Sequence, residues 1–179
     1  MTCIVGLVDG GKVYIGGDSL GADTSSFECT IRADEKVFVN GKFIMGFTTS
    51  FRMGQVLQYV FIPPDHDPRV NAFAYMVTTF MDALRKCLDG AGILTTENGV
   101  QECGNFLVGY DGHLYHVGPD FQVGESRAPY DAVGAGSSQA LGAMFATDGM
   151  EPKARIEMAL KAAERFCMGV RGPFVIKEL

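Results

Sequence analysis

The sequence lacks the features that would place it in a membrane or on nucleic acid. No uncharged apolar run approaches the roughly 18 residues that a transmembrane helix needs. Positive charge is also scarce, with 15 lysine and arginine residues against 21 aspartate and glutamate residues and a net charge of −6. This balance argues against nucleic acid as a partner. The segment up to Asp9 carries no basic residue, so we expect no secretory signal and a cytoplasmic protein that does not bind membranes.

Cysteine pairs and histidine clusters are missing as well. The five cysteines form an odd set with no Cys-x-x-Cys spacing, which is typical of reduced thiols packed as small hydrophobic side chains. Of the three histidines, His113 and His116 lie three positions apart in an apparent strand and therefore point to opposite faces. We expect no metal centre, and no motif indicates an organic cofactor.

The remaining composition describes one domain that is rich in short strands. Apolar residues make up 47% of the 179 residues, and no linker or repeat divides them, so we predict a single domain over residues 1–179. Turn signals at residues 9–12, 40–41 and 111–112 each separate two apolar runs and predict three β-hairpins. Further short strands are expected at residues 121–123, 132–133 and 174–176.

Four helices are predicted among these strands. Ser50 can cap the first, and Asp67 with Pro68 begins a second helix that ends at Gly90. Two more are expected over residues 138–147 and 152–169. The order of strands, two helices, strands, two helices and a strand predicts an antiparallel α+β domain.

One short motif suggests a serine esterase, and the rest of the sequence argues against it. Residues 17–20, Gly-Asp-Ser-Leu, spell the nucleophile motif of the GDSL esterases. Those enzymes also need a histidine base in an Asp-x-x-His motif near the C-terminus, and none follows His116. Ser19 without a base and an orienting acid is not activated, so we interpret the match as coincidental.

The N-terminus offers a different nucleophile. Thr2 follows Met1 directly, and a residue of this size permits removal of the initiator methionine. Removal would leave Thr2 with a free α-amine beside its own hydroxyl. The ordinary pKa of such an amine, roughly 7.7–8.0, lets it accept the hydroxyl proton near neutral pH. Asp18 and Lys36 flank predicted strands that could bring them to Thr2, but Asp–Lys pairs are usually surface ion pairs, so spacing alone does not establish catalysis.

Several segments of the chain resemble proteasome β-type peptidases and the related bacterial ring peptidases. In the N-terminal part of the chain, Asp18 lies sixteen residues after Thr2, as the aspartate does in that family. Lys36 lies two residues later than the lysine of the family usually does. Together the segments are distributed over nearly the whole length of the chain. They are Thr2–Gly6, Gly17–Ser19, Lys36–Val37, Ile44–Ser50, Val133–Ser137 and Cys167–Leu179.

This resemblance implies a fold and an activity. The fold would be a four-layer αββα sandwich, that of the N-terminal nucleophile (Ntn) hydrolases, with two antiparallel sheets between two helix layers. The activity would be that of a threonine-type endopeptidase that cleaves unfolded chains or short peptides inside a homo-oligomer of stacked rings, without a metal or organic cofactor. An unfolding ATPase is a further partner that the resemblance suggests.

The resemblance also implies catalytic roles for four residues. Thr2 would be the nucleophile and, through its amine, the base. Lys36 would lower the pKa of that amine, and Asp18 would orient Lys36. The backbone N–H of Thr49 would stabilise the oxyanion of the tetrahedral intermediate.

Other matching residues would bind the substrate or support the site. Gly21 and Ala22 would pair with the substrate as a β-strand, and Ser137 would support the catalytic residues. A first specificity pocket would be lined by three side chains for which ordinary core packing is an equally good interpretation, namely Phe47, Phe51 and Met53.

Three departures from the family pattern leave other functions open. Residues 48–50, Thr-Thr-Ser, replace the usual Gly-Gly of the oxyanion turn, Ala135 replaces a serine, and Arg165 replaces a second aspartate. These changes restrict φ in the turn and loosen the support of the amine. Two alternatives follow, a catalytically impaired ring scaffold and an Ntn amidohydrolase that acts on a small-molecule amide. An uncleaved Met1 would block the mechanism because it holds the base in an amide.

Overall fold

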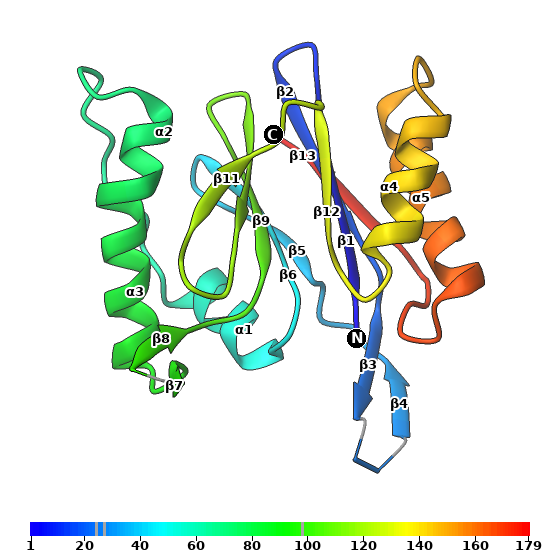
Figure 1. Ribbon diagram of the computed structural model, residues 1–179, viewed down its shortest axis with the longest axis horizontal. Coiled ribbons are helices and arrows are strands. Elements are labelled where there is room, and N and C mark those ends of the chain that lie inside the picture. Colours follow the sequence, from blue (N-terminus) through cyan, green and yellow to red (C-terminus); the bar gives the residue numbers. More distant parts are fainter. Residues whose placement is uncertain (24, 27, 98) are drawn as a thin grey trace.

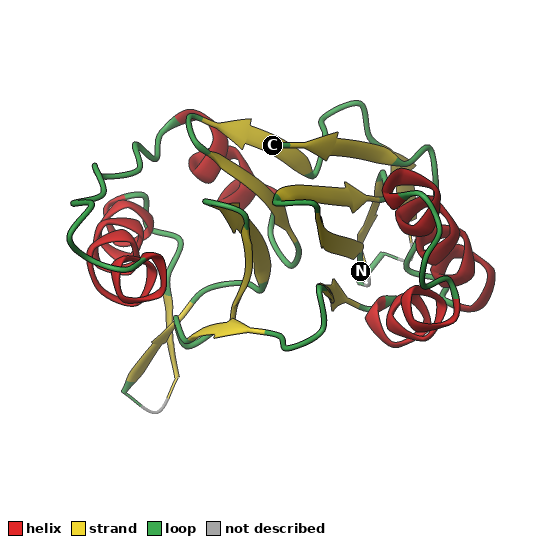
Figure 2. Cartoon of the chain, turned by 90° about the horizontal axis from the view of Figure 1, so that it is seen from above, coloured by secondary structure: helices red, strands yellow, loops and turns green. Residues whose placement is uncertain are grey.

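Two β-sheets lie face to face between two layers of helices in the computed structural model (Figure 1). Figure 2 shows the same order from above, with helices on both sides of the strands. The structure describes residues 1–23, 25–26, 28–97 and 99–179. The predicted α+β class and the four-layer αββα sandwich are confirmed. None of the helices formed by these residues is long and apolar enough to cross a membrane.

Both sheets are antiparallel, and each combines strands from distant parts of the chain. The first sheet has the order β12-β1-β2-β13, formed by Tyr130–Gly134, Cys3–Asp9, Lys12–Gly17 and Val175–Glu178. The second has the order β11-β10-β9-β6-β5, formed by Val123–Glu125, His113–Val117, Phe106–Tyr110, Phe43–Phe47 and Val37–Asn40. The N-terminal strand β1 is therefore central in its sheet.

The three predicted hairpins, β1–β2, β5–β6 and β9–β10, are confirmed. In the last of them Asp111 and Gly112 have φ values of 51° and 75°, the left-handed pair that a type I′ turn requires. Two other hairpins were not predicted. They are β3 (Leu20–Asp23) with β4 (Glu28–Ile31), and β7 (Thr95–Glu97) with β8 (Val100–Glu102).

The β3–β4 hairpin extends away from the sandwich at the end where the N-terminus lies (Figure 1). Every residue of β4 is exposed, so this strand has no buried face. Because a strand without a buried face shows no alternation of apolar and polar residues, the sequence gives little sign of it.

Three of the four predicted helices are found within a few residues of their expected limits. α1 (Phe51–Tyr59) is capped as predicted by Ser50, whose hydroxyl accepts the N–H of Met53 at 3.2 Å. α4 (Ser137–Ala146) and α5 (Pro152–Phe166) complete the C-terminal layer.

The predicted start of the long helix at Pro68 is wrong. The helix begins at Ala72, as α2 (Ala72–Tyr75), and continues through the π-helical segment η1 (Met76–Phe80) into α3 (Met81–Gly90). Asn71 caps it, with Oδ1 accepting the N–H of Ala74 at 2.8 Å. The carboxylate of Asp67, the predicted cap, instead accepts the guanidinium of Arg69. The predicted end at Gly90 is confirmed.

Three apolar clusters hold the layers together. One lies between the second sheet and the helices from α1 to α3, one between the first sheet and α4 with α5, and one between the two sheets. The odd-numbered apolar side chains of β1 face α4 and α5, whereas Ile4 faces the other sheet. This packing brings Thr2, Asp18 and Lys36, which flank β1, β2 and β5, to the same end of the sandwich.

Candidate active site

The structure brings Thr2, Asp18 and Lys36 together. The ammonium of Lys36 donates to Thr2 Oγ1 at 3.0 Å, to Asp18 Oδ1 at 2.9 Å and to the carbonyl oxygen of Leu20 at 2.7 Å. An ammonium has three N–H donors, so each of them has an acceptor. The side chains of Lys36 and Asp18 are 1% and 0% exposed. The cluster is therefore a buried ion pair in contact with a hydroxyl.

The carboxylate of Asp18 is held by backbone donors as well as by Lys36. Its Oδ1 accepts the N–H of Cys3 at 3.0 Å, and its Oδ2 accepts the N–H groups of Leu20 at 3.0 Å and Arg171 at 3.3 Å. These donors belong to three separate segments of the chain. Their convergence fixes the position of the carboxylate and, through it, that of the Lys36 ammonium.

Burial lowers the pKa of Lys36, and the neighbouring carboxylate of Asp18 opposes that shift. The ring of Phe51 is also close, with its centroid 5.6 Å from Nζ. Lys36 thus carries its charge in a site from which water is largely removed, where that charge acts more strongly on the Thr2 hydroxyl than it would in water.

Thr2 is buried just before β1, and both its side chain and its backbone are held. Its hydroxyl accepts from Lys36 and donates to the carbonyl oxygen of Met1. Its own carbonyl accepts the N–H of Gly136 at 3.3 Å. A Cβ at Gly134, where φ is 99°, would lie 2.3 Å from the same carbonyl oxygen. Only glycine allows the turn after β12 to approach the Thr2 backbone so closely.

Thr49 adopts a strained backbone conformation. Its φ is 71°, in the left-handed region that β-branched residues avoid. The N–H of Ser50 donates to the carbonyl of Thr48 at 2.8 Å, so these residues form a γ-turn of the rare left-handed kind. In the described part of the chain no acceptor receives the Thr49 N–H. A conformation of this kind costs about 1–3 kcal/mol, and such strain is concentrated at functional sites.

Gly21 and Ala22 lie on β3, opposite Thr30 and Cys29 of β4. Within the described residues β4 is the only strand paired with β3, so the other edge of β3 has no strand partner. A strand edge without a strand partner can bind an extended peptide backbone.

The three residues predicted for the first specificity pocket are not equally accessible. Phe47 and Met53 are 4% and 0% exposed and belong to the core between the second sheet and its helices, so core packing describes them. Phe51 is half-buried, with its ring 5.8 Å from that of Phe47 and the guanidinium of Arg32 4.1 Å above its face. Phe51 is thus the one member of the three that reaches the surface.

The supporting positions contribute less than the resemblance implies. Ser137 is half-buried at the start of α4, and no hydrogen bond among the described residues joins its hydroxyl to Thr2. Ala135 and Arg165 are both exposed. The backbone groups of Leu20, Gly136 and Arg171 hold the site instead. Main-chain contacts of this kind leave no side-chain pattern in the sequence.

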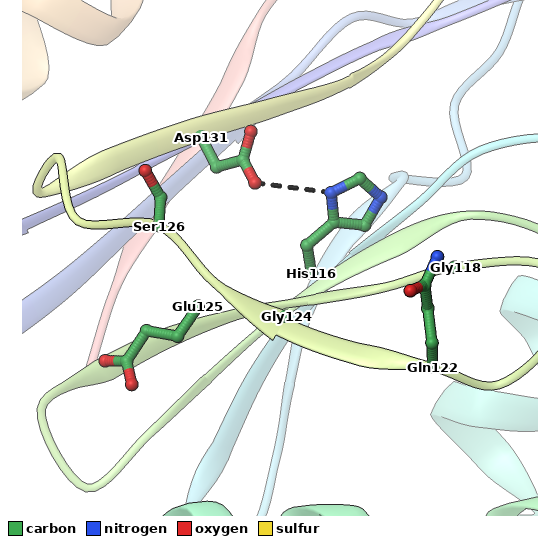
Figure 3. Close-up of a pocket in the computed structure, with 7 residues that line it drawn as sticks. All are labelled: His116, Gly118, Gln122, Gly124, Glu125, Ser126 and Asp131. Atoms are coloured by element: carbon green, nitrogen blue, oxygen red, sulfur yellow. Dashed lines mark hydrogen bonds and ion pairs between the residues drawn. The ribbon is translucent and has the colours of Figure 1, made fainter.

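Two other groups of polar residues do not form catalytic sites. Ser19, the serine of the GDSL-like motif, donates its hydroxyl to the carbonyl of Pro173 at 2.7 Å. A pocket of about 290 Å³ between β10, β11 and β12 contains Ser126, His116 and Asp131, with His116 Nδ1 3.3 Å from Asp131 Oδ2 (Figure 3). The second ring nitrogen of His116 points away from Ser126, so the three residues are not arranged as a catalytic triad.

No metal-binding cluster is found in the part of the chain that the structure describes, where no three His, Cys, Asp or Glu side chains are placed to hold an ion.

The fold, with a threonine directly before its central N-terminal strand, is the sandwich of the Ntn hydrolases. No protein-family model and no curated protein matches the chain. Solved structures of proteasome-like proteins do match it, over nearly its whole length.

Three of these structures come from different proteins. BPH of Thiobacillus denitrificans, in complex with epoxomicin, has a TM-score of 0.82 and 20% identity, covering 99% of this chain and 98% of that chain. Eukaryotic HslV of Trypanosoma brucei has a TM-score of 0.69 and 16% identity, covering 99% of each chain. Anbu, the ancestral β-subunit of Yersinia bercovieri, has a TM-score of 0.67 and 12% identity, covering 99% of this chain and 81% of that chain. The fold is therefore shared with the proteasome-like proteins.

Proposed function

We propose that this chain is a threonine-type endopeptidase whose nucleophile is Thr2 after removal of Met1. The observation that carries the proposal is the buried contact of one ammonium, that of Lys36, with both Thr2 Oγ1 and Asp18 Oδ1. A structural ion pair would not need a threonine hydroxyl in its coordination. Burying a charged pair is costly, and the site keeps that pair beside Thr2, which would carry the α-amine once Met1 is removed.

The mechanism follows from the positions of these groups. The α-amine of Thr2 takes the proton of Oγ1, and Oγ1 attacks the carbonyl carbon of the substrate. The positive charge of Lys36 lowers the pKa of the amine and stabilises the charge that develops on Oγ1. The oxyanion of the tetrahedral intermediate is stabilised by the N–H of Thr49. The amine returns its proton to the leaving nitrogen, and water then hydrolyses the ester on Oγ1.

The free edge of β3 supports a peptide as the substrate. An extended peptide that pairs with Gly21 and Ala22 would run past the nucleophile, since Leu20, the first residue of β3, contacts Lys36 through its carbonyl. Strand pairing recognises backbone rather than side chains, which suits cleavage of unfolded chains of varied sequence.

Assembly into stacked homo-oligomeric rings is part of the proposal. Large apolar side chains are exposed on several helices and loops, among them Ile62 at 85%, Phe145 at 77% and Phe166 at 76%. Exposed apolar surface of this kind is typical of protein–protein contacts. The unfolding ATPase and the cytoplasmic location remain predictions that rest on sequence alone.

A catalytically impaired ring scaffold is the second candidate function. It is favoured by the exposed Ala135 and Arg165 at positions where the family uses polar supporting residues. An amidohydrolase that acts on a small molecule remains an alternative from sequence, and it differs in that it would not cleave peptides.

Covalent trapping tests the proposal. The purified chain is first weighed intact to measure removal of Met1 and is then treated with an epoxyketone, which reacts with the hydroxyl and the free amine together. We expect one adduct per mature chain, none in Thr2→Ala, and an adduct in Thr2→Ser, which keeps both groups. Labelling that persists in Thr2→Ala would show that another residue is the nucleophile. A mature chain that is neither labelled nor active on peptides would be the scaffold.

A further inference from the structure

A cavity of about 360 Å³ adjoins the N-terminus, and Met1 is part of its wall. Most of the remaining wall is apolar and comes from Leu20 and Ala22 of β3, Cys29 of β4 and Met168 after α5. We call this space the Met1 cavity. It lies beside the candidate nucleophile, because Met1 is bonded to Thr2.

Gly169 makes room for the side chain of Met1. A Cβ at this position would lie 2.7, 2.8 and 3.0 Å from Cβ, Cγ and Sδ of Met1. Gly169 is buried, and it is not among the glycines with positive φ. Its backbone conformation therefore does not require glycine. Instead, the absence of a side chain at Gly169 leaves the space that the side chain of Met1 occupies. The structure thus shows an unbranched apolar residue, Met1, which is 42% exposed, packed against Gly169.

The proposed reaction determines which part of a substrate would occupy the Met1 cavity. The leaving nitrogen must receive its proton from the α-amine of Thr2, so it must approach that nitrogen closely. Met1 is the group now attached to the same nitrogen. Once Met1 is removed, the space that it vacates lies on the leaving-group side of the scissile bond.

We infer that the Met1 cavity and Gly169 form a subsite for an unbranched or γ-branched apolar side chain, such as Met or Leu, in the residue that follows the scissile bond. This inference rests on the proposed function. Three charged residues, Asp23, Glu28 and Arg171, also line the cavity, and they are exposed, as are Cys29 and Met168. Two of these three charged residues are carboxylates, so the wall offers an acidic side chain no net attraction.

The test uses peptides that differ only in the residue after the scissile bond, namely Met, Leu, Gly or Asp, with the mature wild-type protein. We expect kcat/KM for the Met and Leu peptides to exceed that for the Gly and Asp peptides by about 10- to 100-fold, as burial of a few methylene groups provides. Equal values for all four peptides would overturn the inference. This comparison needs no variant and therefore does not depend on the folding of one.

Gly169→Ala tests the position of the subsite. We expect the ratio of kcat/KM for the Met peptide to that for the Gly peptide to fall by about 10-fold, mainly through KM. Gly142→Ala is the matched control, because a Cβ at Gly142 meets nothing within 4 Å, and it should leave the ratio unchanged. Met168→Ser, at an exposed position, should lower the same ratio by about threefold. An unchanged ratio in both Gly169→Ala and Met168→Ser would overturn the assignment.

Epoxyketone inactivation separates the two levels of the proposal, since this inhibitor has no residue on the leaving-group side. Normal inactivation of the wild-type protein without a preference among the four peptides would contradict the subsite but not the peptidase activity. Failure of inactivation in the mature protein would contradict both the peptidase activity and the subsite.

Discussion

The Nζ atom of Lys36 lies 3.0 Å from Oγ1 of Thr2, although the two residues are 34 positions apart in the chain. The contact joins the first sheet, which Thr2 precedes, to the second, which Lys36 precedes. It exists only when the two sheets are stacked. The proposed nucleophile and the charge that activates it are therefore assembled by the packing of the sandwich.

Removal of the Lys36 ammonium should lower both the activity and the stability of the protein. We expect Lys36→Ala to lower peptide turnover by about 100-fold or more, because no charge remains to tune the amine or stabilise Oγ1. It also leaves Asp18 as an unpaired buried charge, which costs about 3–5 kcal/mol of folding free energy. Initial rates and urea unfolding measure the two effects.

Two further variants control that experiment. The double variant Asp18→Asn/Lys36→Met removes both charges and should regain stability and assembly without activity. Lys42→Ala, at an exposed lysine, should change neither quantity. Near-normal turnover in Lys36→Ala would contradict the proposed role.

The pH profile should report the charge on Lys36. Burial lowers the pKa of Lys36, so the ammonium loses its proton at a lower pH than the ordinary value of about 10.4. We expect kcat/KM to fall on the alkaline side below that value. Lys36→Arg keeps a positive charge that does not titrate, so its alkaline limb should disappear even where its overall rate is lower. An identical alkaline limb in both proteins would assign it to another group.

The buried Lys36 should also affect the pH dependence of stability. Because its pKa in the folded protein is lowered, the unfolded chain binds more protons between that pKa and about 10.4, and stability rises with pH in this window. Asp18→Asn/Lys36→Met should lack this contribution. Urea midpoints of the wild-type protein and of this double variant, taken across the pH window, measure the contribution. Parallel curves for the two proteins would show that the pKa of Lys36 is not lowered.

Thr49→Gly should stabilise the protein. The left-handed φ of 71° strains a β-branched residue but not glycine, so we expect the free energy of unfolding to rise by about 1 kcal/mol. Thr48→Gly is the neighbouring control, and it should destabilise the protein because it removes the hydrogen bond from Thr48 Oγ1 to the carbonyl of Asn105 at 2.8 Å. Denaturant midpoints decide between these outcomes. A loss of stability in Thr49→Gly would show that the threonine side chain outweighs the strain.

Gly134→Ala should disturb Thr2 directly. Its Cβ would lie 2.3 Å from the Thr2 carbonyl oxygen, so the nucleophile must move, and we expect turnover to fall by at least about 10-fold. Gly149→Ala is the matched control, since Gly149 also has a positive φ, 81°, but nothing lies within 4 Å of its Cβ position. Both variants should lose stability, whereas only Gly134→Ala should lose turnover. Equal turnover in the two would show that Gly134 acts through backbone strain alone.

Light scattering should find an assembly larger than a monomer. We expect Phe145→Ser/Phe166→Ser to weaken it, because these exposed aromatic side chains on α4 and α5 provide apolar contact area. Ser138→Ala, an exposed change on the same helix layer, serves as the control. A wild-type monomer at micromolar concentration would contradict the ring and favour an enzyme that acts on small amides.

Local signals in the sequence were sufficient for much of the fold. Asp111 and Gly112 adopt left-handed φ values that few other residues accept, so this pair, placed between two apolar runs, marks a hairpin. Ser50 caps α1 through a hydrogen bond with Met53, only three positions away, so the cap can be recognised from the sequence. The start of the long helix was missed because Asp67 and Asn71 are both good caps. In the structure Asn71 caps the helix, and the carboxylate of Asp67 accepts from Arg69 instead.

Other features depend on residues that only the folded chain brings together. Phe47 and Met53 could line a pocket or fill the core, and the stacking of α1 on the second sheet puts both in the core. The room for Met1 depends on Gly169, from the opposite end of the chain.

The sequence by itself therefore determined the hairpins and most helix limits, because each depends on local backbone preference, and its resemblance to proteasome β-type peptidases singled out Thr2, Asp18 and Lys36 as candidates. Tertiary structure decided that these three residues meet, that Thr49 is strained and that a cavity opens beside Met1. The physical reason is that burial, charge pairing and close backbone approach are properties of segments far apart in the chain, and they are defined only once the two sheets have packed.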